Sequence, residues 1–301
     1  MRLLKHVFRA STCLLLLSGN ASAQEPDTSV ACERPCKRCI AFISAGAGVA
    51  ATVAYIGLDQ AWYAQYDRGP LRTFDDSDEW LLMDKTGHLL SGYMLGAWGH
   101  AAMKHCGSND RSARWVGGSV GLAFMTGIEI LDGTSAGWGF SWSDMAANAA
   151  GAGLFIAQDA AWGEQRMALK ISLRHTPYAA QRPDLLGEGF ADRLLKDYNG
   201  VTLWLSGNLA GLSGSTRLPK WLNIAVGYGA EGMISAYPLE QVGGPAVFRQ
   251  FYLSPDVDLT RIKTKSRVVR TLLFLANSIK VPAPALEYRS NGEWKGHWLH
   301  F

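Results

Sequence analysis

The spacing of apolar and polar residues changes near Gly163. Before this position, apolar and small residues recur at helical spacing in four segments. The first covers about 40–66, the third 114–131 and the fourth 143–162. The second can be capped by Ser77 and runs to about Lys104. After it, apolar and polar residues alternate, which is typical of antiparallel strands with one face in water. The pattern predicts an α+β fold, with a Gly/Ala-rich four-helix bundle over 40–163 and an antiparallel β-rich region with helical inserts over 164–301.

The helical segments have features of a membrane-associated bundle. The uncharged stretch Ile40–Leu58 approaches the roughly 20 residues that cross a bilayer, whereas the fourth segment has only Met145–Ala157 as its apolar part. Only 18% of the chain is charged, below the roughly 25% typical of soluble domains. Glycine and alanine also allow the close backbone approach found in membrane bundles. We therefore expect a bundle in or against a membrane, with a wholly soluble bundle as the alternative.

The alternating segments of the second half offer about six to eight strands, some of them short. In one of them Leu253 lies on one face, and Ser254 and Asp256 lie on the other. The last segment is amphipathic and ends on Phe301, as do many outer-membrane barrels. The sheet is therefore predicted to be barrel-like, soluble, or half-submerged at a membrane surface, and a closed barrel would make a small outer-membrane pore.

The first 23 residues resemble a secretory signal peptide, with a basic start, a short apolar run and small residues before Gln24. Cys13 lies in the apolar run without the leucine-type lead of a lipoprotein signal, so we do not expect acylation there. Removing the signal takes away three of the 29 basic residues and none of the 26 acidic ones, which leaves a formally neutral chain. The charge balance therefore gives no reason to expect a nucleic-acid partner.

Four cysteines remain in the exported chain: Cys32, Cys36, Cys39 and Cys106. An even number in an oxidising compartment favours disulfides. The first three lie in a separate N-terminal segment, 24–39, whose spacing also allows an iron–sulfur cluster or a four-thiolate zinc site as lesser alternatives. If the first two helical segments form an antiparallel hairpin, Cys106 lies beside Cys36 and Cys39, and one of these two should pair with it.

Few ionisable or amide residues interrupt the apolar helical half, and burial without partners would be costly for them. We expect one polar cluster of Asp84, Lys85, His88, Glu129, Asp132, Asp144 and Asn148. Asp84 and His88 share a helix face. With Glu129 and Asp144 they could hold a divalent metal, or His88 could act as a general base beside Asp84.

The structural alternative for the same residues is a network of satisfied polar contacts. In that interpretation Ser141 and Asp144 form a capping box, Asp84 and His88 share one buried hydrogen bond, and Lys85 pairs with Glu129 or Asp132. No nucleophile motif or phosphate-binding glycine loop is evident. We expect no cofactor beyond a divalent metal.

The stretches "DKTGHLLSGY" and "EILDGTSAGWGFSWSDMAANAAG" resemble the YfiM-like family of periplasmic lipoproteins, a domain of unknown function. The family's pattern falls on Asp84, Lys85, His88, Glu129, Asp132, Gly133, Gly139, Ser141 or Ser143, Asp144 and Gly151. More distantly, the Asp-Lys-x-x-His stretch together with Asp144, Asn148 and Gly151 is similar to the VanZ-like membrane family. The resemblance implies a cell-envelope location and no particular reaction, and the chain departs from a lipoprotein in lacking a lipobox.

Together these features predict an exported protein of the bacterial cell envelope, at the outer membrane or on the periplasmic face. We expect a non-enzymatic structural or ligand-binding protein with membrane lipid, in particular a lipid or glycolipid headgroup, and envelope proteins as partners. One alternative is a metal-assisted hydrolase or transferase acting on a lipid-linked phosphate, and the other is the small pore.

Overall fold

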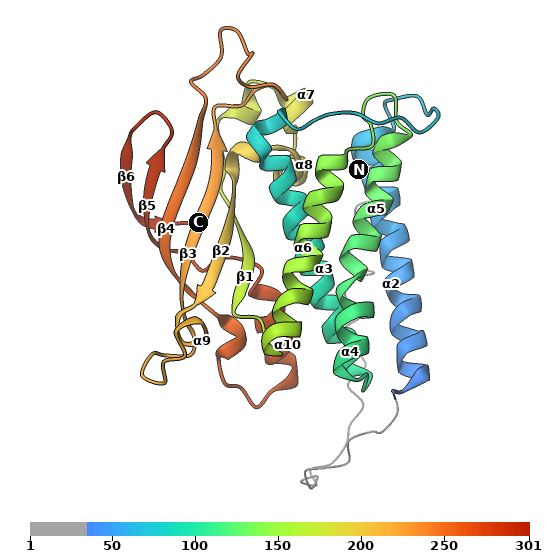
Figure 1. The fold of residues 1–301 in the computed structure, drawn as a ribbon. Coiled ribbons are helices and arrows are strands. Elements are labelled where there is room, and N and C mark those ends of the chain that lie inside the picture. The colour runs from blue at the N-terminus through green and yellow to red at the C-terminus, as the bar shows by residue number, and fades with distance from the viewer. Residues whose placement is uncertain (1–34) are drawn as a thin grey trace, which may run out of the picture. The chain divides into compact units, whose positions relative to one another are not determined.

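A computed structural model of the chain describes residues 35–301 (Figure 1). The predicted signal peptide, Cys13 and Cys32 lie outside these residues. A helical N-terminal part stands beside an antiparallel sheet, and its long helices run alongside the strands (Figure 1). The prediction of helices followed by an antiparallel sheet is confirmed.

The helical part contains four long helical stretches, as the apolar spacing predicted. They are α2 (Lys37–Leu58, extended by a π-helical turn over Asp59–Tyr63), α3 (Met83–His105), α4 with α5 (Asp110–Ser112 and Val120–Gly133, joined by a π-helical turn over Ala113–Gly117) and α6 (Trp142–Trp162). Helix α6 ends at Gly163, whose positive φ of 66° suits a glycine C-cap.

The start of α3 differs from the prediction. Ser77 does not cap the helix, because Trp80, Leu81 and Leu82 adopt positive φ angles of 50°, 52° and 70° and separate it from α3. The hydroxyl of Ser77 instead donates to Asp75. The Trp80 N–H donates to the Ala236 carbonyl at 2.7 Å, which ties this left-handed turn to the loop after strand β3 (Leu222–Glu231).

Three helices pack tightly and one does not. Gly92 and Gly151 let α3 and α6 approach until their backbones touch. Helix α2 has no buried residue and lies against α5 chiefly through Tyr55, whose ring stacks on Phe124 at 4.7 Å. The helical character of this part is therefore confirmed, whereas the finer prediction of one four-helix bundle is not.

Helix α2 is held at its N-terminal end by a disulfide between Cys39 and Cys106, which confirms the predicted pairing. Among the described residues, Cys36 has no disulfide partner. By length and composition, the stretch Lys37–Tyr63 is the one helix within residues 35–301 that is long and apolar enough to cross a membrane.

The sheet has six strands in sequential order, and each pairs antiparallel with the next. They are β1 (Met167–Leu173), β2 (Val201–Asn208), β3 (Leu222–Glu231), β4 (Phe248–Val257), β5 (Ala283–Arg289) and β6 (Trp294–His300). Short helices fill the connections: α7 (Pro183–Leu186), α8 (Phe190–Lys196), α9 (Leu209–Ser213) and α10 (Arg267–Ala276).

The sheet is open, which corrects the barrel-like prediction. Strands β1 and β6 are its edges and do not pair with each other. The edge of β1 instead makes a single parallel bridge from Ile171 to Ile279. A pore through a closed barrel therefore has no basis in the described part of the chain.

The two faces of the sheet are reversed relative to the prediction of a polar face in water. Ser254 and Asp256 are 1% and 2% exposed, whereas Leu253 between them is 47% exposed. The reason is curvature: the sheet bends around its polar face until Trp204 on β2 meets His300 on β6, with ring centroids 5.6 Å apart. Near β1 and β2 the apolar face packs on the helices, where Leu169 and Leu203 join a cluster with Phe155.

Candidate functional site

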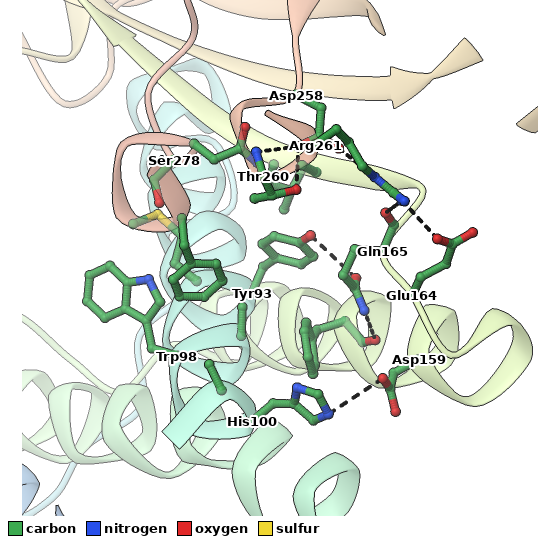
Figure 2. Close-up of a pocket in the computed structure, with 18 of the residues that line it drawn as sticks. Tyr93, Trp98, His100, Asp159, Glu164, Gln165, Asp258, Thr260, Arg261 and Ser278 are labelled. Atoms are coloured by element: carbon green, nitrogen blue, oxygen red, sulfur yellow. Dashed lines mark hydrogen bonds and ion pairs between the residues drawn. The ribbon is translucent and has the colours of Figure 1, made fainter. Parts of the chain in front are cut away.

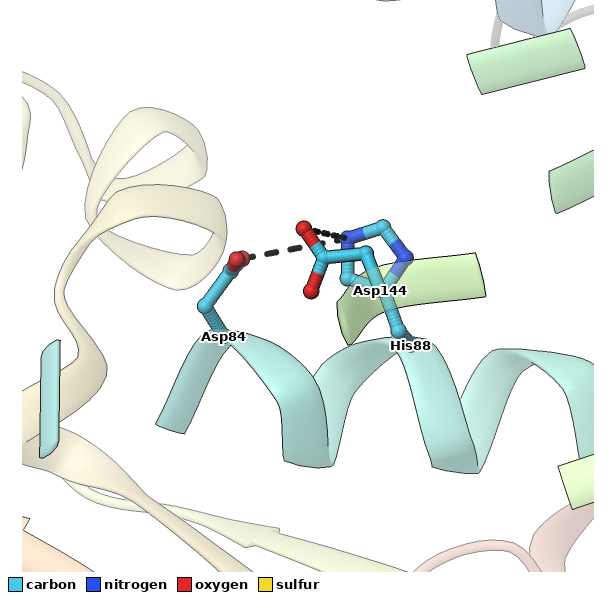
Figure 3. A group of neighbouring side chains, drawn as sticks. All are labelled: Asp84, His88 and Asp144. Carbon is cyan, nitrogen blue, oxygen red and sulfur yellow. Dashed lines mark ion pairs between the residues drawn. The ribbon is translucent and has the colours of Figure 1, made fainter. Parts of the chain in front are cut away.

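A polar cluster forms where the start of α3, the end of α5 and the start of α6 meet. Asp84 and His88 lie one turn apart on α3, and Asp144 reaches them from the first turn of α6 (Figure 3). Glu129 on α5 and Asn148 on α6 complete its buried side, and both are fully buried. The structure thus brings together six of the seven predicted residues: Asp84, Lys85, His88, Glu129, Asp144 and Asn148.

Asp132 lies apart from the cluster. Its Oδ1 accepts a hydrogen bond from the Tyr63 hydroxyl at 2.7 Å. Burial raises the pKa of Asp132 to about 7, and the charge of Asp84 adds to this effect.

Lys85 is the positive centre of the cluster. Its Nζ lies 2.7 Å from Asp76 Oδ2, 3.1 Å from Asp144 Oδ1 and 3.2 Å from Asp84 Oδ2. The expected pairing with Glu129 or Asp132 is therefore wrong. Asp76 was missed by sequence reasoning because it lies in the loop before α3, where no periodicity marks it.

His88 faces different groups with its two ring nitrogens. Its Nδ1 lies 3.1 Å from Asn148 Oδ1 and 3.3 Å from Glu129 Oε1. Its Nε2 lies 3.9 Å from Asp84 Oδ1 and 3.8 Å from Asp144 Oδ2. The last two distances are too long for hydrogen bonds, so the expected single bond between Asp84 and His88 is not formed.

Ser141 and Ser143 join the loop to the helices. The Ser141 hydroxyl caps α6 by accepting from the Asp144 N–H at 3.1 Å, and it donates to Asp76 Oδ1 at 2.6 Å. The reciprocal bond of a capping box comes from another helix, because the Ser141 N–H donates to Glu129 Oε2 at 3.2 Å. The predicted cap is therefore present, and Glu129 takes the role expected of Asp144.

The cluster has more acidic groups than one lysine can neutralise. Burial raises the pKa of Glu129 to about 8 and that of Asp144 to about 9, and neighbouring carboxylates, Asp84 among them, add to both shifts. Burial also opposes ionisation of Asp76, but hydrogen bonds from the Asp144 carboxyl, from Lys85 and from the two serines outweigh it, and its pKa falls to about 2.

Several buried polar atoms of the cluster have no hydrogen-bond partner within residues 35–301. They are Glu129 Oε1, Asp144 Oδ1 and Asn148 Nδ2. Buried polar groups are normally paired, so unpaired ones in a cluster call for an explanation. A proton or a bound cation can satisfy the two carboxylate oxygens, of which Asp144 Oδ1 has only the ion pair with Lys85, whereas Asn148 Nδ2 needs an acceptor.

Asp84, His88 and Asp144 have the arrangement of metal ligands. One ligand atom from each residue lies within 4.8 Å of the others. Carboxylate oxygen and imidazole nitrogen together suit Zn²⁺ or Mn²⁺. Glu129 lies behind the imidazole of His88, where it can orient the ring but cannot share the same ion.

A hollow of about 350 Å³ lies elsewhere, where α3 and α6 meet the start of β1 and the segment after β4 (Figure 2). Two of its charged groups have ion-pair partners: His100 Nε2 lies 3.6 Å from Asp159 Oδ1, and Arg261 Nη2 lies 2.9 Å from Glu164 Oε2. Sequence reasoning did not identify this hollow, because its lining comes from segments that are far apart in the chain. It contains none of the cluster residues.

Comparison with known proteins places the cluster inside a recognised domain. Residues 73–158 match the family described as predicted periplasmic lipoprotein (DUF2279), as the resemblance implied. The matched range contains Asp76 and every other residue of the cluster. No curated protein and no solved structure matches the chain significantly. The similarity to the VanZ-like family stays a prediction.

Proposed function

We propose that this chain, whose residues 73–158 match the predicted periplasmic lipoprotein family, is a cell-envelope protein that binds a divalent metal ion through Asp84, His88 and Asp144. One observation carries the proposal. His88 Nε2 faces Asp84 Oδ1 and Asp144 Oδ2 at 3.9 and 3.8 Å, with no hydrogen bond to either oxygen.

The hydrogen bonds around His88 support this assignment. Asn148 Oδ1 is an acceptor, so Nδ1 carries the proton and donates to it, with Glu129 Oε1 3.3 Å away. The lone pair of Nε2 then points toward two carboxylate oxygens. Three acceptors facing one another repel unless a cation lies between them.

Lys85 supports the same geometry from the other side. Its Nζ lies 3.2 Å from Asp84 Oδ2 and 3.1 Å from Asp144 Oδ1, while the other oxygens of these carboxylates, Asp84 Oδ1 and Asp144 Oδ2, face His88. The Tyr198 hydroxyl also donates to Asp84 Oδ1 at 2.9 Å. Such surrounding hydrogen bonds orient the ligands of metal sites.

The site favours a cation over a direct phosphate contact. Lys85 already has three carboxylate partners, and the remaining carboxylates would repel a lipid phosphate. A headgroup phosphate would therefore bind through the metal. Three protein ligands leave coordination positions for water, so metal-assisted hydrolysis or transfer is the reaction class that the site supports.

The test is the metal content of the mature protein purified without chelator, beside the variants His88→Gln and Asp144→Asn. His100→Gln is the matched control, because His100 also lies on α3 and also faces an aspartate. We expect near-stoichiometric Zn²⁺ or Mn²⁺ in the wild type and in the control, and at least a tenfold loss in the two cluster variants.

A wild type that binds neither ion, as purified or after titration, would refute the proposal. Protons on Glu129 and Asp144 would then be what balances the cluster, and its role would be to hold α3, α5 and α6 together. Equal metal content in wild type and His88→Gln would place the ion elsewhere.

A further inference from the structure

The exposed face of the sheet is apolar over most of its area. We call the face that carries Val226 and Leu253 the outer face. Its aliphatic side chains are between 37% and 53% exposed: Leu205, Ile224, Val226, Leu253 and Leu286. They come from four neighbouring strands in matching register, so they form one continuous band. A soluble monomer rarely exposes so large an apolar patch.

The opposite face of the same strands is buried and carries many polar side chains around an apolar cluster that contains Trp204 and Tyr252. Lys170 and Asp256 form an ion pair at 2.7 Å with no exposure of either side chain. Asp256 also accepts from the Ser206 hydroxyl at 2.6 Å. A sheet in water places its apolar face inside and its polar face outside. Polar-in and apolar-out is the pattern of strands that face lipid.

Aromatic side chains border the aliphatic band. One row crosses β3 to β6 through Tyr228, Phe251, Tyr288 and Trp294, with successive ring centroids 5.7, 6.4 and 4.9 Å apart. At the other end of β3, Trp221 is exposed just before the strand begins. From Trp221 to Tyr228 the strand rises roughly 23 Å at about 3.3 Å per residue. Lipid-facing bands of outer-membrane strands are about 25 Å tall and end in rows of aromatic residues, as this face does at the Tyr228 end.

The Trp221 end of the sheet carries positive charge. The Asp258 N–H donates to the Trp221 carbonyl at 2.8 Å, so the segment after β4 starts at this end. No acidic residue occurs between Asp258 and Glu287, whereas Lys263, Lys265, Arg267 and Arg270 are exposed or nearly so. This charge complements the phosphates of anionic lipid headgroups.

Helix α10 lies in this basic segment and has an apolar side without a partner among the described residues. Val268, Val269, Leu272 and Leu275 are all exposed, while Phe274 turns inward to line the hollow of Figure 2. A short helix with an exposed apolar side and flanking basic residues suits the interface between headgroups and acyl chains.

We propose that the outer face of β3, β4 and β5 contacts the hydrocarbon of an anionic lipid bilayer, with α10 at the headgroup layer on the Trp221 side. The apolar stretch Lys37–Tyr63 is on the opposite side of α3 and α6 and runs in the direction of the strands (Figure 1). Both surfaces can therefore face lipid in a single orientation of the molecule. The proposal does not depend on the metal site.

The first test is photocrosslinking from the outer face in native membranes. A benzophenone side chain replaces Val226 or Leu253 in the mature chain, and the control position is Asn291, which is exposed in the turn between β5 and β6. We expect phospholipid adducts at Val226 and Leu253, and at least tenfold fewer at Asn291. Adducts to another protein or to a second copy of this chain, or no lipid adduct at either position, would overturn the proposal.

The second test is flotation with vesicles of phosphatidylethanolamine and phosphatidylglycerol, compared with phosphatidylcholine alone. Val226→Asp should lower the bound fraction at least tenfold on both, and Lys265→Glu with Arg270→Glu should lower it on the anionic vesicles only. Asn291→Asp is the control, and formation of the Cys39–Cys106 disulfide reports folding. Equal flotation of Val226→Asp and wild type would contradict a lipid-facing outer face.

Discussion

Asp132 shows how a single buried carboxyl makes stability depend on pH. Burial raises its pKa from 3.8 to about 7, so the folded state holds its proton more tightly than the unfolded state. The contribution of the protonated Asp132 carboxyl to the free energy of unfolding is complete below about pH 3.8 and is lost as the pH rises through 7. We expect Asp132→Asn to be more stable than wild type by about 2 kcal/mol at pH 8 and nearly equal at pH 4, measured by urea unfolding in detergent.

The control for this prediction is Asp132→Ala. Asparagine keeps an oxygen that can accept from Tyr63, whereas alanine does not. The alanine variant should therefore lose about 1 kcal/mol relative to asparagine at every pH. If the gain in Asp132→Asn were independent of pH, titration of this carboxyl would not be its cause.

Residues on helices could be placed in the candidate site from the sequence, and residues from loops could not. The spacing of Asp84 and His88, and the cost of leaving Asp144 alone in an apolar helix, were enough to predict their convergence. Asp76 and Tyr198 also bind cluster residues, but they come from segments with no periodic pattern. Their contacts depend on the left-handed turn before α3 and on the chain after β1.

At the scale of the helices, the close packing of α3 against α6 depends on glycine. A Cβ atom on Gly92 would lie 2.5 Å from the Asn148 carbonyl oxygen, whereas one on Gly153 of α6 meets nothing within 4 Å. Gly92→Ala should therefore force α3 and α6 apart and cost about 2–3 kcal/mol. Gly153→Ala should gain roughly 0.5–1 kcal/mol from helix propensity. Thermal unfolding of both variants checks this, and equal effects would contradict the packing argument.

Helix α2 has no buried residue, so we expect it to unfold locally without unfolding the rest of the molecule. Its tertiary contacts are the Cys39–Cys106 disulfide, the Tyr55–Phe124 stack and bonds near Tyr63. We expect Cys106→Ser to raise the rate of proteolysis within 37–63 at least tenfold while the sheet and α6 stay protected from amide exchange. Global unfolding of the variant at 25 °C would show that α2 stabilises the whole molecule.

At the scale of the molecule, alternation predicted the strands but not which face is inside. Leu253, Ser254 and Asp256 alternate in the same way whether the sheet packs its apolar or its polar side. The choice is made by curvature and by the helical part, which covers the apolar face near β1 and β2 and also packs Leu81 against Tyr228 and Ala230 of β3. Both features depend on contacts between segments that are distant in the sequence, such as Trp204 with His300. A local pattern of apolar and polar residues cannot predict such contacts.

Because the sheet buries its polar face, we expect the ion pair on that face to contribute more to its stability than the exposed apolar side chains. Lys170 and Asp256 are a fully buried ion pair, so Lys170→Met should cost about 3–5 kcal/mol by leaving an unpaired buried charge. Lys170→Met with Asp256→Leu removes both charges and should recover at least half of that loss. Leu286→Ala on the outer face should cost less than about 1 kcal/mol, because its side chain is 45% exposed. Urea unfolding in detergent ranks the three variants. If Leu286→Ala lost more unfolding free energy than Lys170→Met, the apolar face would be the core of the sheet. That result would contradict both the burial of the polar face and the proposed lipid contact of the outer face.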